Sequence, residues 1–320
     1  MNADPDGPQP ERHGRWRLAV LAVLLAGGAG LIGLLARNRP ASPLQTSLAM
    51  PFQLLGTPVQ LADRLASRAI PVGSLQERQL GDTFRRRYEA QIQPGDANQA
   101  YLDGLMPPLR RHARRAFPYR AFLIGRCGSP NAWALPGGVI LVSQELLEQL
   151  GSEAELMAVL AHELGHIELG HSFDAVRFRL LARRGGIEPL GQLADGAARL
   201  LLQQSYSKAA EHEADDYAYA LLLSSRYDPA ALGRAFGALN RAHGGGDRAE
   251  HHADPLRDLL RSHPPGALRE ADYAQRAAAW WRQHPSERRY VGAANLQRRQ
   301  PLEQLDLAQE WVGAAAQAAR

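Results

Sequence analysis

The chain has a single cysteine and no internal repeat array. Cys127 is the only cysteine among 320 residues, so no internal disulfide can form, although this neither indicates nor excludes an oxidising compartment. The formal net charge is only +4, and the basic excess is mostly arginine in short clusters with acidic residues interspersed. No basic stripe with interleaved aromatic residues is present, which argues against nucleic-acid binding. Because 45% of the residues are hydrophobic, the composition supports a real core.

One stretch near the N-terminus lacks charge altogether. From Leu18 to Ala36 no residue is charged, and this length is close to the roughly 20 residues that span a bilayer. Trp16 suits a membrane interface, and arginines bracket both ends of the stretch. We therefore predict an uncleaved transmembrane anchor over residues 18–36. A cleaved signal peptide is the alternative, because Ala and Gly at residues 26–30 offer small-residue cleavage sites.

The arginines also predict an orientation for this anchor. Slightly more of them precede the span than follow it, so the positive-inside rule places residues 1–17 in the cytoplasm. The rest of the chain then lies across the inner membrane, in the periplasm of a Gram-negative bacterium. We expect a linker with several prolines over residues 37–60.

Five consecutive residues, His162 to His166, form the H-E-x-x-H signature of zinc hydrolases. Ser152 and Glu155 make a capping box before it, and apolar residues recur at helical spacing after it, so the signature lies on a predicted helix. Residues four apart share one face of a helix, so both imidazoles can reach one metal ion. A solvated helix that carries two histidines by chance is the alternative, but buried histidines need partners, and a metal supplies one.

A catalytic zinc site needs a third protein ligand and an open position for water. Residues 206–215 are alanine-rich and free of Gly and Pro, which predicts a second helix. Glu211 and Asp215 share a face of it, so one carboxylate can bind the metal while the other accepts a hydrogen bond from a ligand histidine. His212 or Glu213 as the ligand, and an acidic solvated face, remain alternatives.

Several motifs in this order resemble the gluzincin metallopeptidase family of the CAAX prenyl protease, HtpX and the mitochondrial Oma-type protease. The metal-binding segments match as H-E-x-x-H followed by E-x-E-A-D on a later helix. Three other segments resemble the family motifs N-A-[FW]-A-x-P-G-G, S-H-P-P and E-x-x-x-G, and these are residues 131–138, 262–265 and 77–81. The similarity runs from about residue 70 to about residue 275.

The resemblance implies one Zn²⁺ held by His162, His166 and Glu211, with Glu163 as the general base. Asp215 would then orient a ligand histidine. These roles are those of a peptidase in which the metal and a carboxylate together activate water.

Further predictions concern the substrate. His263 matches a family histidine that would donate a hydrogen bond to the oxyanion, with an ordinary turn residue as the alternative; Asn131 matches an asparagine near the substrate. Val139, Ile140 and Leu141, followed by Val142, read as a strand. An exposed edge there would bind extended polypeptide by strand addition, and an ordinary buried strand is the alternative.

Together these features predict an α+β fold: a predominantly helical zincin-like domain with a small sheet over residues 61–290, preceded by one transmembrane helix and followed by a helical tail over 291–320. The expected activity is zinc-dependent endopeptidase cleavage of unfolded or misassembled envelope proteins, which is protein quality control. A chaperone or adaptor with little turnover, and a zinc amidohydrolase acting on a small substrate, are the other function classes.

Overall fold

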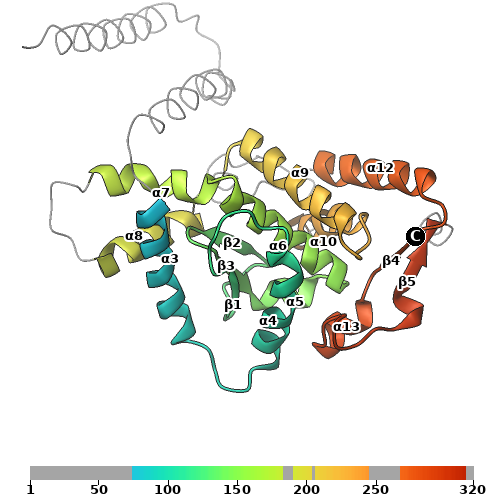
Figure 1. The fold of residues 1–320 in the computed structure, drawn as a ribbon, viewed down its shortest axis with the longest axis horizontal. Helices are drawn as coiled ribbons and strands as arrows, with labels where there is room; N and C mark the ends of the chain where they lie inside the picture. Colours follow the sequence, from blue (N-terminus) through green and yellow to red (C-terminus); the bar gives the residue numbers. More distant parts are fainter. Residues whose placement is uncertain (1–73, 183–189, 204–205, 245–266, 315–320) are drawn as a thin grey trace, which may run out of the picture. The chain divides into compact units, whose positions relative to one another are not determined.

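The computed structural model describes residues 74–182, 190–203, 206–244 and 267–314 (Figure 1). The predicted tail, anchor and linker, residues 1–60, lie outside the described residues, and so does His263. A search of the described helices finds none that is long and apolar enough to cross a membrane. The described residues form a predominantly helical α+β structure with two small sheets, as predicted.

The main sheet has three strands in the order β1-β3-β2: β1 is Arg120–Ile124, β2 is Ala132–Leu135 and β3 is Val139–Ser143. The central strand β3 is parallel to β1 and antiparallel to β2. β2 and β3 are joined by a tight turn whose Gly137 and Gly138 have φ values of 79° and 93°, a region that favours glycine.

The prediction that Val139, Ile140 and Leu141 offer an exposed edge is wrong, because β3 is the central strand. Its backbone is paired on both sides, and all five of its residues are buried. Among the described strands of this sheet, β2 has an unpaired edge and is the strand against which the predicted metal-binding helix mainly packs, and the four residues of β2 are buried as well.

Helices cover both faces of the sheet (Figure 1). Alternate strand residues therefore point into two different cores: Ile140 and Val142 into one, Val139 and Leu141 into the other. The first face packs on α4 (Ala97–Arg110) and α6 (Glu153–Glu168), and the second on α3 (Ser74–Glu89), α7 (His171–Ala182) and α8 (Leu190–Gln203).

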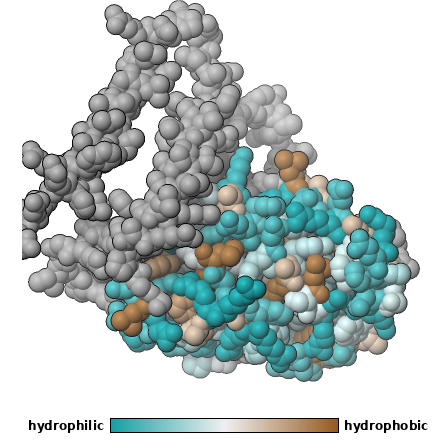
Figure 2. Space-filling model, turned by 45° about the horizontal axis from the view of Figure 1, so that its top comes forward, coloured by the Kyte–Doolittle hydropathy of each residue, from teal (hydrophilic) through white to brown (hydrophobic). Residues whose placement is uncertain are grey.

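The remaining helices pack around α6 and each other. They are α5 (Gln144–Gln149), α9 (Lys208–Ser224), α10 (Ala231–Gly244) and α12 (Ala267–Gln283). On the face drawn in Figure 2 the described surface is mostly hydrophilic with scattered hydrophobic residues, so the apolar side chains lie mainly in the cores.

The helix α6 begins where the sequence predicts it. The side chain of Ser152 accepts a hydrogen bond from the backbone N–H of Glu155 and caps the helix. Gly165 lets α6 approach α9 closely, because a Cβ atom there would lie 3.2 Å from the Cα atom of Ala214. This approach brings the two predicted metal-binding helices together.

The helix α3 rests directly on the β2–β3 turn. A Cβ atom on Gly81 would lie 2.6 Å from the Cα atom of Gly137. Two of the motifs noted in the sequence, one in residues 77–81 and one in residues 131–138, therefore meet at a contact between backbones that only glycine permits.

The prediction of a helical tail over residues 291–320 is wrong for its described part. Residues 291–314 contain only one short α-helix, α13 (Ala293–Arg298), then a 3₁₀ turn (Ala308–Glu310) and the strand β5 (Trp311–Gly313). β5 pairs antiparallel with β4 (Arg288–Tyr290).

The C-terminal segment, residues 291–314, forms hydrogen bonds with the start of α6. The backbone carbonyls of Gly292 and Val291 accept hydrogen bonds from the N–H groups of Glu153 and Ala154. The buried carboxylate of Glu153 in turn accepts from the N–H of Leu302 and from two tyrosine hydroxyls, those of Tyr101 and Tyr227. Two of the free N–H groups in the first turn of the helix are thus satisfied by the C-terminal segment, and Ser152 satisfies that of Glu155.

Candidate metal centre

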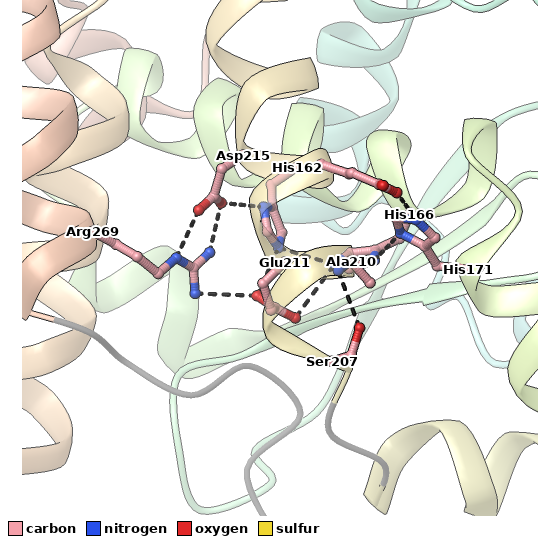
Figure 3. Close-up of polar contacts among 9 residues, drawn as sticks. His162, His166, His171, Ser207, Ala210, Glu211, Asp215 and Arg269 are labelled. Carbon is pink, nitrogen blue, oxygen red and sulfur yellow. Dashed lines mark hydrogen bonds and ion pairs between the residues drawn. The ribbon is translucent and has the colours of Figure 1, made fainter. Parts of the chain in front are cut away.

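Two histidines and one glutamate converge from α6 and α9 (Figure 3). The Nε2 atoms of His162 and His166, one helical turn apart, lie 3.1 Å from each other. Glu211 places one carboxylate oxygen 3.6 Å from the Nε2 of His162 and the other 3.6 Å from that of His166. All three side chains are buried.

These distances fit a metal ion. Zinc bonds of about 2.0–2.1 Å in a tetrahedron place neighbouring ligand atoms about 3.3–3.4 Å apart. The distances of 3.1 and 3.6 Å lie on either side of that value. Two imidazole nitrogens with one carboxylate also match the donor types of catalytic zinc sites. In the described part of the chain, this trio is the group whose ligand atoms lie close enough to share an ion.

A buried ion pair holds the first of the two histidines. The Nδ1 atom of His162 lies 2.8 Å from Asp215, whose two oxygens accept hydrogen bonds of 2.6 and 2.7 Å from the guanidinium of Arg269 on α12. Burial alone would raise the pKa of Asp215, but the hydrogen bond from His162 and the charge of Arg269 outweigh it and hold that pKa below its usual value. Asp215 therefore stays ionised and keeps His162 with its Nε2 atom toward Glu211.

Arg269 also reaches the predicted metal ligand. Its Nη1 atom lies 3.1 Å from an oxygen of Glu211, and its guanidinium stacks 4.2 Å above the ring of Phe236. One arginine thus contacts both carboxylates that face the histidines.

The second histidine packs against an aromatic ring. Tyr206 lies just before α9 and stacks on the ring of His166, with the centroids 3.9 Å apart and the planes at 17°. Burial, and then the charges of Glu163 and Glu211, raise the pKa of Tyr206 well above its usual value, so its hydroxyl stays protonated as a donor.

Glu163, the predicted general base, is almost fully buried and follows His162 directly on α6.

Asn131 holds the start of the edge strand. Its carbonyl accepts a hydrogen bond from the N–H of Ser143, and its own N–H donates to the Ser143 hydroxyl. Its side-chain oxygen accepts from the N–H of Ala132 at 2.9 Å. These contacts give Asn131 a structural task at the beginning of β2, next to the helix that carries the histidines.

Sequence reasoning missed Arg269, Tyr206 and His171. His171 lies against His166, and its signal was a third histidine five residues after the signature. Arg269 follows the predicted Ser-His-Pro-Pro segment by four residues, and Tyr206 directly precedes the Ser207 that caps α9. No single-sequence pattern ties Arg269 or Tyr206 to the histidines, because their contacts join segments that are far apart in the sequence.

Comparison with known proteins places these features in a family. The model of peptidase family M48 matches residues 96–277, which is more than half of the chain. The metalloprotease YcaL of Escherichia coli K12 is 29% identical over 163 residues, which cover 47% of this chain and 59% of YcaL. The mitochondrial metalloendopeptidase OMA1 of Arabidopsis thaliana is 31% identical over 149 residues, 45% of this chain and 29% of OMA1.

A third relative aligns over more of the chain. The beta-barrel assembly-enhancing protease of Escherichia coli K12 is 25% identical over 241 residues, 68% of this chain and 47% of that protein. The chain thus spans less than two thirds of the length of each of these relatives. The chain belongs to peptidase family M48, and the family resemblance predicted from its motifs is confirmed.

Proposed function

We propose that this member of peptidase family M48 is a zinc-dependent endopeptidase that cleaves unfolded or misassembled envelope proteins. The observation that carries the proposal is the meeting of His162, His166 and Glu211 at distances that suit one tetrahedral ion. The names of the relatives, all of them proteases, support cleavage of polypeptides over the alternative classes.

Each residue then has one task. His162, His166 and Glu211 hold the ion, which supplies Lewis-acid activation of water and of the scissile carbonyl when it is bound. Glu163 takes the proton from the attacking water and delivers it to the leaving amine. The role of His263 as a donor to the oxyanion stays a proposal, because this residue lies outside the described part of the chain.

The substrate backbone pairs with β2 in this proposal. The hydrogen bond from Ser143 N–H to the Asn131 carbonyl marks a bonded pair, so the alternation of an antiparallel ladder turns the backbone groups of Ala132 and Ala134 toward the free edge. The N–H of Ala132 is taken by the Asn131 side chain, which leaves the carbonyl of Ala132 to accept and Ala134 to donate and accept. Pairing of this kind reads main chain more than side chains and suits unfolded polypeptide.

One experiment separates the three function classes. Three purified proteins are compared: wild type, Glu163→Gln and Glu148→Gln. Each is assayed for metal content, for binding of unfolded casein, and for cleavage of unfolded casein and of a short blocked amide. We expect one zinc ion per chain in all three and casein cleavage in all but Glu163→Gln. Glu148 is the matched control, because it is an exposed glutamate in an ion pair with Arg126.

The other outcomes identify the alternatives. Casein binding without cleavage by the zinc-loaded wild type favours a chaperone or adaptor. Hydrolysis of the short amide alone favours an amidohydrolase. Full casein cleavage by Glu163→Gln would refute the assigned general base.

We further propose that residues 18–36 anchor the protein in the inner membrane with the catalytic domain in the periplasm. The uncharged run and the arginines around it support this. Alkaline extraction of membranes tests the anchor, and protease access to the domain in spheroplasts tests the orientation. Release at alkaline pH, or protection in intact spheroplasts, would contradict the respective part.

A further inference from the structure

His166 contacts a third histidine on its side away from Glu211. The Nδ1 atom of His166 lies 3.0 Å from the Nδ1 atom of His171, the first residue of α7. The Nε2 atom of His171 lies 3.0 Å from a carboxylate oxygen of Glu213 on α9. Figure 3 shows His171 beside His166, on the opposite side of the site from Asp215 and Arg269.

His166, His171 and Glu213 form a series of hydrogen bonds, and its protons have one consistent arrangement when a metal is bound. The metal takes the Nε2 lone pair of His166, so its ring proton resides on Nδ1 and must be donated. His171 accepts that proton's hydrogen bond at Nδ1, so its own proton resides on Nε2. That proton is then donated to the Glu213 carboxylate. A single tautomer of each ring therefore satisfies both short contacts.

The backbone keeps His171 in this place. Gly170, with a φ of 84°, ends α6 and turns the chain so that α7 starts directly beside His166. The side chain of His171 is 9% exposed, whereas that of Glu213 is 43% exposed. The series of hydrogen bonds thus runs from the buried ring of His166, through the nearly buried imidazole of His171, to the exposed carboxylate of Glu213.

We propose that His171 is a positioning residue for His166: together with Glu213 it orients the ring and strengthens metal binding, as Asp215 and Arg269 do for His162. This rests on the proposed function, in that a metal ion binds at His162, His166 and Glu211. It also gives the E-x-E-A-D segment a physical reading. Glu211 binds the metal, while Glu213 and Asp215 each support a different ligand histidine.

Zinc affinity, measured by competition with a chromophoric chelator, tests the proposal without any activity assay. His171→Ala is expected to raise the zinc Kd about 10–100-fold, as is usual when a group that supports a metal ligand is lost. His171→Asn is expected to lose less, because its Oδ1 atom lies near the position of Nδ1 and can still accept from His166. The matched control is His212→Ala, since His212 is an exposed histidine that pairs with Asp216 at 3.4 Å.

A second pair of variants covers the case in which His171→Ala does not fold. Glu213→Gln removes the charge of the carboxylate that accepts from His171. Asp216→Asn removes one carboxylate charge from the same helix and leaves the hydrogen bonds of His166, His171 and Glu213 in place. Glu213→Gln is expected to raise the zinc Kd at least threefold more than Asp216→Asn does.

The outcomes separate the two proposals. A wild-type protein that binds no zinc refutes the proposed function. A wild-type protein that binds zinc, with His171→Ala binding as tightly, refutes the positioning role alone. Equal losses in His171→Ala and His171→Asn would also refute it, as would equal Kd values for Glu213→Gln and Asp216→Asn where His171→Ala fails to fold.

Discussion

Replacing Arg269 with methionine should destabilise the metal-free protein strongly. The guanidinium makes hydrogen bonds of 2.6 and 2.7 Å with Asp215 and lies 3.1 Å from Glu211. The side chains of these two acids are only 1% and 4% exposed. Without the arginine, two neighbouring carboxylates remain buried with no cation between them.

The magnitude follows from that burial. Removing one partner of a buried ion pair costs about 3–5 kcal/mol, because the remaining charge stays desolvated. The guanidinium also leaves the face of the Phe236 ring, and methionine replaces this cation–π contact with a weaker sulfur–aromatic one, which adds a smaller loss than that of the ion pair. We therefore expect Arg269→Met to lower the free energy of unfolding by about 3–5 kcal/mol.

Arg276 on the same helix provides the control. It pairs with Asp216 at 2.7 Å and with Asp272 at 3.0 Å, but all three side chains are more than a third exposed. Exposed pairs contribute about 0–1 kcal/mol, so Arg276→Met should change little. Urea unfolding in the presence of a chelator measures both variants.

Two results would refute this reasoning. One is an Arg269→Met variant no less stable than Arg276→Met. The other concerns the double variant Asp215→Asn with Arg269→Met, which should lose less than the sum of the single losses because the two residues contact each other. Additive losses would show that the pair is not a unit.

Two other perturbations are informative. Gly81→Ala should destabilise the protein by about 1–3 kcal/mol, because the new Cβ atom meets the Gly137 backbone. The control in thermal unfolding is Gly125→Ala, since a Cβ atom at Gly125 has open space around it. Equal melting temperatures of the two variants would contradict this prediction. Burial raises the pKa of Glu153 above 4.5 against the opposing hydrogen bonds, so the folded state binds this proton more tightly and stability falls as the pH rises above about 4.5. Glu153→Gln should flatten that fall when unfolding free energies are compared between pH 4.5 and 7, and an unchanged slope would refute the assignment.

The features that the sequence predicts well are local ones. The cap at Ser152 and the apolar spacing after it depend on neighbours along one helix, and α6 begins where they indicate. The carboxylate at Glu211 also follows from spacing on a single helix, once α9 is recognised. Its meeting with the histidines depends on Gly165, whose small size allows the close packing of α6 and α9.

The features that the sequence does not reveal are set by distant contacts. An unbroken apolar run such as Val139 to Val142 is typical of a strand covered on both faces, and only the strand order shows that it is central. The Ala- and Gln-rich end favours helix locally, yet Trp311 to Gly313 form a strand because β4 offers a partner. Arg269 and His171 reach the site from other helices, so their tasks appear only in three dimensions.

The hydrogen bonds from Glu153 and Ala154 to the carbonyls of Gly292 and Val291 bear on where the catalytic unit can be cut. The family match ends at residue 277, yet the acceptors that complete the first turn of the metal-binding helix lie beyond it. A shortened version ending at residue 290 would strip both acceptors, and the partner at Leu302 as well, from a helix that needs a fixed start to aim its histidines. Any recombinant fragment meant to retain the peptidase site should therefore extend at least through β5.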